Sequence, residues 1–236
     1  MRTADLEEKP RRVGSMFNRI VPHYDLMNTL MTGGRDRAWR RLAVSMSQPA
    51  GADGLDVGTG TAELALELRR QGARSVVGVD FSWEMLRAAR HKTSASDTTT
   101  APLLLAGDAL NLPFPDQSFD LVISGFVIRN VADIAQAFHE MRRVLRPGGR
   151  VVCLEITHPR PGLFARLFRL YFYRLVPLLG SLIARDFDAY RYLPNSLTSF
   201  PPADGLARLM EGAGLVDVQY QLLSGGSVAV HRGYRA

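Results

Sequence analysis

Three stretches carry small or acidic residues at points where an apolar run ends. Gly58 and Gly60 lie in LDVGTGTAEL, Asp80 closes VVGVD, and Asp108 closes LLLAGD. Glycine lets the backbone approach a ligand closely, and the start of a helix offers unsatisfied N–H groups. A carboxylate like Asp80 can accept both hydroxyls of a ribose. One like Asp108 can accept a hydrogen bond from an adenine amino group, with Ala109 against the ring. The three stretches therefore predict a site for an adenosine-containing cofactor.

This glycine-rich turn differs from the turn of a dinucleotide site. The dinucleotide fingerprint has a third glycine three residues after the second, and Glu63 occupies that position. We therefore expect neither a nicotinamide nor a flavin. Each acid alone also has a structural explanation: Asp80 can cap a helix that begins near Ser82, and Asp108 can close a turn. Their combination on successive strands favours cofactor binding far more strongly than either acid alone.

The elements that must bring these stretches together follow from an alternation of apolar runs and amphipathic segments. Such alternation is typical of a sheet of parallel strands covered by helices, and such sheets bind ligands at the carboxyl ends of their strands. We expect strands at 54–58, 75–80, 103–108, 119–124 and 151–156, helices near 62–71, 83–90 and 133–145, a polar loop at 93–102 and a tight turn at 146–149.

The pattern changes after about residue 160. We expect a basic, aromatic helical region at 163–185, a loop at 190–202, a helix near 203–213, and two strands joined around Ser224-Gly225-Gly226 as an antiparallel hairpin. The predicted fold class is α/β, with a mostly parallel sheet that ends in this hairpin. We expect residues 1–50 to form a helical cap over the substrate, and residues 51–236 to form the main domain with a helical insertion at about 160–200.

Size, charge and cysteine content narrow the class of protein. A chain of 236 residues can bury one substantial core, and Cys153, its only cysteine, excludes an internal disulfide. The first residues lack an apolar segment of signal-peptide length, and the longest apolar run, 175–184, is shorter than the roughly 20 residues of a membrane span. We therefore expect a cytoplasmic protein. The net charge of +6 only weakly suggests an anionic partner.

Several motifs together resemble those of the class I S-adenosylmethionine-dependent methyltransferases. These motifs are the glycine-rich turn, the two acids, PFPDQSFD before the fourth strand and RPGG before the fifth. The flanking sequences narrow the resemblance to the UbiE/MenG family of quinone-biosynthesis C-methyltransferases, over about residues 13–235. The flanking sequences that carry this resemblance are MFNRIVPHYDLMNTLMTGGRDRAWRR, GFVIRNVAD, RVLRPGGRVVCLEITHP, AYRYLPNSLTSFP and SGGSVAVHRGY. The resemblance implies a Rossmann-like fold and S-adenosylmethionine as cofactor. It also implies methylation of a ring carbon of a polyprenylated quinol: demethylmenaquinol to menaquinol, or alternatively the corresponding benzoquinol step toward ubiquinol.

Carried over position by position, the family's cofactor-binding threonine falls on Thr61. The chain departs from the family at Ala62-Glu63, where Gly-Asp is common, and at Gly125, which aligns with a serine or glycine one residue beyond Ser124. The cofactor-binding residues that we expect are Gly58, Gly60, Thr61, Asp80, Asp108, Ala109 and Gly125.

The ring carbon becomes nucleophilic when a hydroquinol hydroxyl loses its proton. A phenol titrates near pH 10, so the site needs a base or a cation that stabilises the phenolate. Arg129, at the family's Arg-Asn position after the fourth strand, is the expected cation, although a surface arginine would be the simpler explanation. His23, Tyr24 and Asp25 are the expected proton-transfer residues, although a packed tyrosine and a helix-capping aspartate would explain them equally well. The spacing of the histidines predicts no metal site.

A polyprenyl quinol resides in a membrane, so the enzyme must meet it at the surface. Arg166, Arg169 and Arg174 share one arc of the 163–185 helical region with apolar residues over the rest, as in an interfacial helix. A helix packed over the substrate is the compatible alternative. We expect peripheral contact at the inner face of the membrane.

Three other functions share parts of these motifs. A small-molecule O-methyltransferase would have the same cofactor residues. A nucleic-acid methyltransferase would suit the positive charge, but SGFV after the fourth strand is not the Asn/Asp-Pro-Pro-aromatic motif of base methylation, so we expect no nucleic acid. A non-catalytic binding module would have lost part of the cofactor residues, and the sequence shows no such loss.

Overall fold

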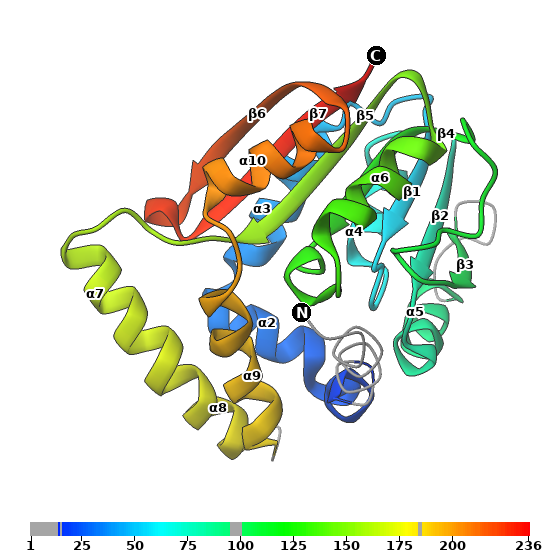
Figure 1. Ribbon diagram of the computed structural model, residues 1–236. Coiled ribbons are helices and arrows are strands. Elements are labelled where there is room, and N and C mark those ends of the chain that lie inside the picture. The colour runs from blue at the N-terminus through cyan, green and yellow to red at the C-terminus, as the bar shows by residue number, and fades with distance from the viewer. Residues whose placement is uncertain (1–13, 15, 95–100, 184–185) are drawn as a thin grey trace.

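A seven-stranded sheet forms the centre of the molecule (Figure 1). The computed structural model describes residues 14, 16–94, 101–183 and 186–236. The strand order is β3-β2-β1-β4-β5-β7-β6. The first five strands run parallel, and β7 is inserted antiparallel between β5 and β6, which confirms the predicted fold class. The strands are β1 (Asp53–Val57), β2 (Ser75–Asp80), β3 (Leu103–Ala106), β4 (Phe119–Gly125), β5 (Leu145–Ile156), β6 (Leu215–Leu223) and β7 (Val228–Arg235).

Helices cover both faces of the sheet and extend beyond the carboxyl ends of its parallel strands (Figure 1). They are α2 (Tyr24–Thr32), α3 (Arg35–Met46), α4 (Glu63–Arg70), α5 (Trp83–Ser94), α6 (Ile134–Val144), α7 (Leu163–Leu170), α8 (Val176–Ile183), α9 (Phe187–Thr198) and α10 (Ala203–Gly212). Short 3₁₀ turns are η1 (Val21–His23), η2 (Ile128–Asn130) and η4 (Ser224–Gly226), and the π-helical η3 (Tyr171–Leu175) joins α7 to α8. Across the described residues, no helix is both long and apolar enough to span a bilayer.

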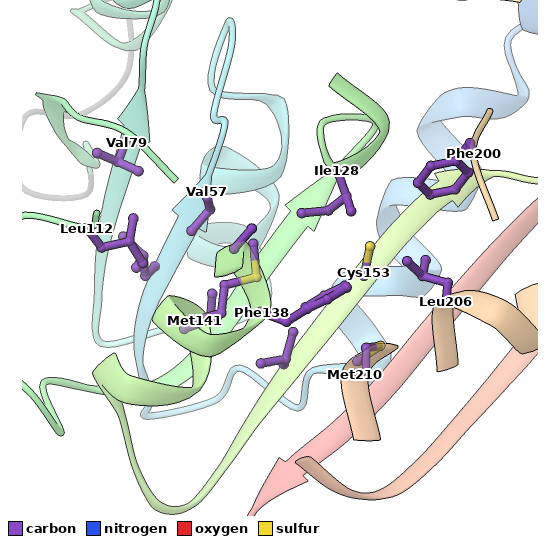
Figure 2. Close-up of a cluster of buried hydrophobic side chains, with 14 of the residues drawn as sticks. Val57, Val79, Leu112, Ile128, Phe138, Met141, Cys153, Phe200, Leu206 and Met210 are labelled. Carbon is purple, nitrogen blue, oxygen red and sulfur yellow. The ribbon is translucent and has the colours of Figure 1, made fainter. Parts of the chain in front are cut away.

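The two faces of the sheet belong to two separate apolar cores. Along β5, Val151 and Cys153 face the core that α6 and α10 cover, whereas Val152 and Leu154 face the core beneath α3 and α4. Figure 2 shows Cys153 in the first core with Phe138 of α6. Both alternating sets of β5 side chains are buried, as expected for a strand in the middle of a sheet that is covered on both faces.

The N-terminal segment lies at the carboxyl ends of the strands. Residues 16–20 are helical, and the 3₁₀ turn that contains Pro22 joins them to α2. The proline accounts for this interruption, because the residue before a proline disfavours the α-helical conformation. Helix α2 ends at Gly33, whose φ of 58° is in the left-handed region that glycine adopts readily.

The prediction of a loop at 190–202 was wrong, because most of this stretch is helix α9. Asp186 caps the helix by accepting a hydrogen bond from the Ala189 amide at 3.0 Å. Pro194 lies inside the helix, where it removes one backbone donor. Burial of Tyr190 and Leu197, which are 1% and 2% exposed, offsets this loss. Two smaller differences are that α5 continues through Ser94, into the predicted polar loop, and that the predicted turn at 146–149 is an irregularity within β5.

Candidate active site

A cavity that is partly open to solvent lies at the carboxyl ends of β1, β2 and β4. Parallel pairing of these strands brings together residues that are distant in the sequence. Of the predicted cofactor residues, five line this cavity: Gly58, Gly60, Asp80, Asp108 and Ala109. The turn after β1 requires glycine, because Gly58 has a φ of 70° and a Cβ there would lie 2.3 Å from Val127 Cγ2.

Asp80 organises the backbone of this cavity. Its Oδ2 accepts a hydrogen bond from the Gly60 amide, and its Oδ1 accepts one from the Ser82 amide, both at 2.8 Å. Ser82, and not Asp80, caps α5, because the Ser82 Oγ accepts the Met85 amide at 3.1 Å. Burial raises the pKa of the Asp80 carboxyl, and the backbone donors partly offset this effect. A carboxylate held in this way keeps lone pairs for a ligand in the cavity.

The side of the cavity after β3 is built by Asp108 and Ala109. The Asp108 Oδ1 accepts the Leu110 amide at 2.9 Å, which fixes the turn and keeps the carboxyl at the cavity wall. Asn130 of η2 lines the same cavity, and its buried Oδ1 has no hydrogen-bond partner among the described residues. The cavity therefore presents acidic and amide oxygens, and Phe81, Met85 and Leu110 supply apolar surface.

Two predicted cofactor residues, Thr61 and Gly125, are not among the described residues that line this cavity. The Thr61 Oγ1 donates a hydrogen bond to the Asp25 Oδ1 of α2 at 2.7 Å. Gly125 makes room for Leu64 of α4, because a Cβ there would lie 2.6 Å from the Leu64 Cδ1. Their cofactor-binding roles stay predictions.

Asp25 joins the N-terminal segment to the edge of the sheet. It is not among the described residues that line this cavity or the second cavity described below. Besides accepting from Thr61, it forms an ion pair with Lys92 of α5, which also pairs with Glu63 of α4 at 2.7 Å. A second connection runs from the Ser82 Oγ to the Asn18 Oδ1 at 2.7 Å. Residues 16–32, hereafter the cap, are therefore held against the turn after β1 and the start of α5.

A second cavity adjoins the first beneath the cap. Phe17, Tyr24 and Phe126 line both cavities, so these three side chains form the wall between them. Phe126 has a φ of 62°, a conformation that is uncommon for a residue with a side chain. The guanidinium of Arg40 lies over its ring, 5.4 Å from the centroid. The rest of the second cavity is mainly aromatic and aliphatic, with contributions from α2, α3, η3 and α9.

Arg129 lines the second cavity and is only 7% exposed, so it is not a surface arginine. Its Nη1 forms an ion pair with Glu155 of β5 and donates to the Phe126 carbonyl at 2.8 Å. Its buried Nε has no hydrogen-bond partner among the described residues. Burial raises the pKa of Glu155, and the charge of Arg129 partly offsets the rise. Arg129 thus places a cation at the cavity, and Glu155 compensates its charge.

The structure separates the three polar residues of the cap. Tyr24 faces both cavities, and burial raises the pKa of its phenol, so the hydroxyl stays protonated near neutral pH. Asp25 binds Thr61 and Lys92, and His23 is not among the described residues that line either cavity. These placements favour Tyr24 over His23 and Asp25 for direct contact with a substrate.

Several residues that line the second cavity, and Glu155, which pairs with one of them, were not predicted from the sequence. Asp36 and Arg40 form a buried ion pair at 2.6 Å, four residues apart on α3. Their spacing is a signal for such a pair, but it does not show that the pair is buried. Glu155 interrupts the apolar run of residues 151–156. A charged residue within such a run is the available sequence signal for a buried charge. Tyr190 lies on α9, which the sequence analysis interpreted as a loop.

Asp56 is buried behind the glycine-rich turn. Its Oδ2 accepts hydrogen bonds from the Thr59 Oγ1 at 2.7 Å and the Ala65 amide at 3.1 Å. Burial raises the pKa of Asp56 from 3.8 to about 7. The folded state therefore retains a proton that the unfolded state has lost, so this group lowers stability as the pH rises between these two values.

We predict that Asp56→Asn, which cannot ionise, removes this contribution. The melting temperature of the wild type should fall relative to that of the variant as the pH rises from about 4 to about 7. Thermal unfolding of both proteins at several pH values measures the difference. A difference that does not change with pH would contradict the assigned cause.

The sequence as a whole matches known proteins closely. Residues 4–235 match the ubiE/COQ5 methyltransferase family. A demethylmenaquinone methyltransferase of Roseiflexus castenholzii is 44% identical over 97% of this chain and 95% of its own length. One of Thermus thermophilus is 46% identical over 93% and 100%, and the ubiquinone/menaquinone biosynthesis C-methyltransferase UbiE of Geotalea daltonii is 40% identical over 97% and 98%.

A solved S-adenosylmethionine-dependent methyltransferase of Thermotoga maritima has a similar fold, with a TM-score of 0.67 at 22% identity over 94% of this chain and 99% of that one. The first cavity suits this cofactor, because its glycine turn, two carboxylates and orphaned Asn130 oxygen match an adenosine and an amino acid in chemistry. The chain belongs to the ubiE/COQ5 methyltransferase family, and it is an S-adenosylmethionine-dependent methyltransferase.

Proposed function

We propose that the protein methylates a ring carbon of a polyprenylated quinol and that its main substrate is demethylmenaquinol, which it converts to menaquinol. The observation that carries the proposal is the second cavity. It is largely apolar, it shares a wall with the cofactor cavity, and it contains a buried arginine. The names of the relatives from Roseiflexus and Thermus support demethylmenaquinol. The name of the Geotalea relative supports a benzoquinol as the second candidate.

The cofactor supplies a methyl group on a sulfonium, and the residues of the first cavity hold it. We assign the ribose hydroxyls to Asp80 and the adenine to Asp108 and Ala109, with Gly58 and Gly60 giving the backbone access to the ligand. The enzyme's largest task in such a displacement is to align both reactants in a site without water. Phe17, Tyr24 and Phe126 suit this task because they lie where the two cavities meet.

Arg129 is the group that we assign to the phenolate. Its free Nε can donate to the quinol oxygen next to the carbon that is methylated, and the positive charge favours loss of that hydroxyl's proton. Glu155 holds the guanidinium in place. Tyr24 stays protonated near neutral pH and so serves as a hydrogen-bond donor rather than as the base.

A direct assay tests the proposed function. Purified protein with methyl-labelled S-adenosylmethionine should transfer the label to a ring carbon of demethylmenaquinol, identified by mass spectrometry and NMR, and should leave catechol unmethylated. The double variant Arg129→Gln/Glu155→Gln removes both charges, so neither is left buried and unpaired. It should remain folded by circular dichroism and turn over roughly 10²- to 10³-fold more slowly. Label on an oxygen, or on catechol alone, would support an O-methyltransferase instead.

We further propose that the cap closes the cofactor site and that Lys92 stabilises the closed position. Lys92 connects α5 to Asp25 of the cap, but the pair is partly exposed, with side chains that are 30% and 43% accessible. Such pairs contribute roughly 0.2–1 kcal/mol and are screened by salt.

Lys92→Met should therefore raise the KM for S-adenosylmethionine up to about fivefold and make that KM less dependent on salt. Arg87→Met is the matched control, because Arg87 of the same helix forms an ion pair only with Glu84, at 3.4 Å, within the part of the chain that the structure describes. Steady-state kinetics at low and high salt measure both effects. Equal KM values for the two variants would reject this role of Lys92.

The outer helices suit contact with the lipid surface in which the quinol resides. Leu163, Leu167 and Leu170 of α7 are 74%, 56% and 60% exposed, and Leu178 of α8 is 52% exposed. Arg166, Arg169 and Arg174 are exposed on the same helical segment. Figure 1 shows α7 and α8 at the outer edge of the helical layer, and the second cavity reaches this layer at Phe168 and Tyr171. Apolar side chains beside arginines favour an anionic lipid surface.

We expect the protein to bind vesicles that contain phosphatidylglycerol more tightly than vesicles of phosphatidylcholine alone. Leu163→Ser/Leu170→Ser should weaken binding by more than about tenfold, because insertion of each leucine contributes roughly 1.5–3 kcal/mol. Val216→Ser is the control, since Val216 is 42% exposed on β6, away from these helices. Co-sedimentation measures the partition, and equal loss in both variants would reject α7 as the contact surface.

A further inference from the structure

The second cavity contains a buried hydroxyl that the protein itself does not satisfy. Tyr190 lines the cavity and is 1% exposed, and its hydroxyl has no hydrogen-bond partner among the described residues. The Arg129 Nε shares this property among the described residues, whereas other polar side chains of the cavity have partners. Asp36 and Arg40 pair with each other, and the hydroxyl of Tyr171 donates to the Met31 carbonyl at 2.8 Å.

Packing prevents the ring of Tyr190 from turning the hydroxyl away. It belongs to the main apolar core, and it lies directly against Gly180 of α8, where an added Cβ would be 2.1 Å from the Tyr190 Cγ. Helices α8 and α9 thus pack closely at a glycine that leaves room for this ring. The packed ring therefore holds the hydroxyl in place, and leaving a buried hydroxyl unsatisfied is costly. A buried polar group without a partner calls for a ligand or a water that completes it.

The chemistry of this hydroxyl is that of a permanent donor. Burial raises the pKa of the Tyr190 phenol, with a smaller contribution from the nearby Tyr24 and Asp186. It therefore keeps its proton at neutral pH and cannot act as a base. A neutral donor suits a hydroquinol, because each hydroquinol oxygen can accept a hydrogen bond. The ring carries two such oxygens on opposite sides.

We propose that the Tyr190 hydroxyl donates a hydrogen bond to one ring oxygen of the quinol, opposite to the oxygen that Arg129 stabilises. This inference rests on the proposed function of the second cavity. Arg129 comes from η2 after β4, whereas Tyr190 comes from α9, so two separate elements would hold the ring at two points. Two contacts fix the rotation of a flat ring, and with it the carbon that faces the cofactor cavity. Tyr190 is then a residue that sets which carbon is methylated.

Tyr190→Phe tests this proposal, because it removes the hydroxyl and keeps the ring that packs on Gly180. The KM for demethylmenaquinol should rise roughly 2- to 12-fold, the value of one hydrogen bond, while the KM for S-adenosylmethionine stays unchanged. In the absence of substrate, the melting temperature should stay the same or rise, because the variant buries one unsatisfied polar group fewer. A purely structural role would instead lower the melting temperature and leave the quinol KM unchanged.

Tyr171→Phe is the matched control in the same cavity. The Tyr171 hydroxyl already donates to the Met31 carbonyl. Removing this hydroxyl leaves the carbonyl without that donor and should lower the melting temperature. Its effect on the quinol KM should be smaller than that of Tyr190→Phe. If the wild type methylates demethylmenaquinol and Tyr190→Phe has the same quinol KM, the role of Tyr190 is rejected and the proposed function stands. If the wild type does not methylate the quinol, both are rejected.

Discussion

The parallel pairing of β1, β2, β3 and β4 is the constraint on which the rest of the site depends. Hydrogen bonds along these strands fix their register, so the glycine turn, Asp80 and the turn at Asp108 must meet at one edge. The same register places η2 directly after β4, which brings Arg129 next to the cofactor cavity. None of these residues is near another in the sequence, and sheet topology alone gives them a common location.

The cap converts this open edge into two adjoining cavities. Tyr24 and Phe17 complete a wall whose third member, Phe126, comes from the sheet, and hydrogen bonds from Thr61 and Ser82 hold the cap in position. A methyl transfer between a polar cofactor and an apolar quinol needs two environments that touch at one point. The two cavities differ in this sense, since Asp80 and Asp108 line the first, whereas aromatic helices surround the second. The charged side chains that line the second cavity are compensated: Arg40 pairs with Asp36, and Arg129 pairs with Glu155 behind it.

Much of this could be predicted from the sequence, because the parallel strands have strong, regular signals. β2 has the predicted bounds, and β1 and β4 agree with prediction within one residue at each end, since their apolar runs are bounded by turn residues. Helix α9 was not predicted because Pro194 and its polar neighbours resemble a loop, and only tertiary burial of Tyr190 shows otherwise. Thr61 and Asp25 were assigned to the cofactor and to proton transfer, although in the structure they bind each other. A sequence pattern shows which side chains are available, but which of them pair depends on how the cap docks.

We propose that this chain adds the ring methyl group of menaquinone. Quinone profiling of a strain from which the gene has been deleted tests it most directly, with extracted quinones separated and weighed by mass spectrometry. We expect demethylmenaquinone to accumulate, menaquinone to be lost, and a plasmid copy of the gene to restore menaquinone. A deletion strain with an unchanged menaquinone content and no demethylated precursor would rule out this role.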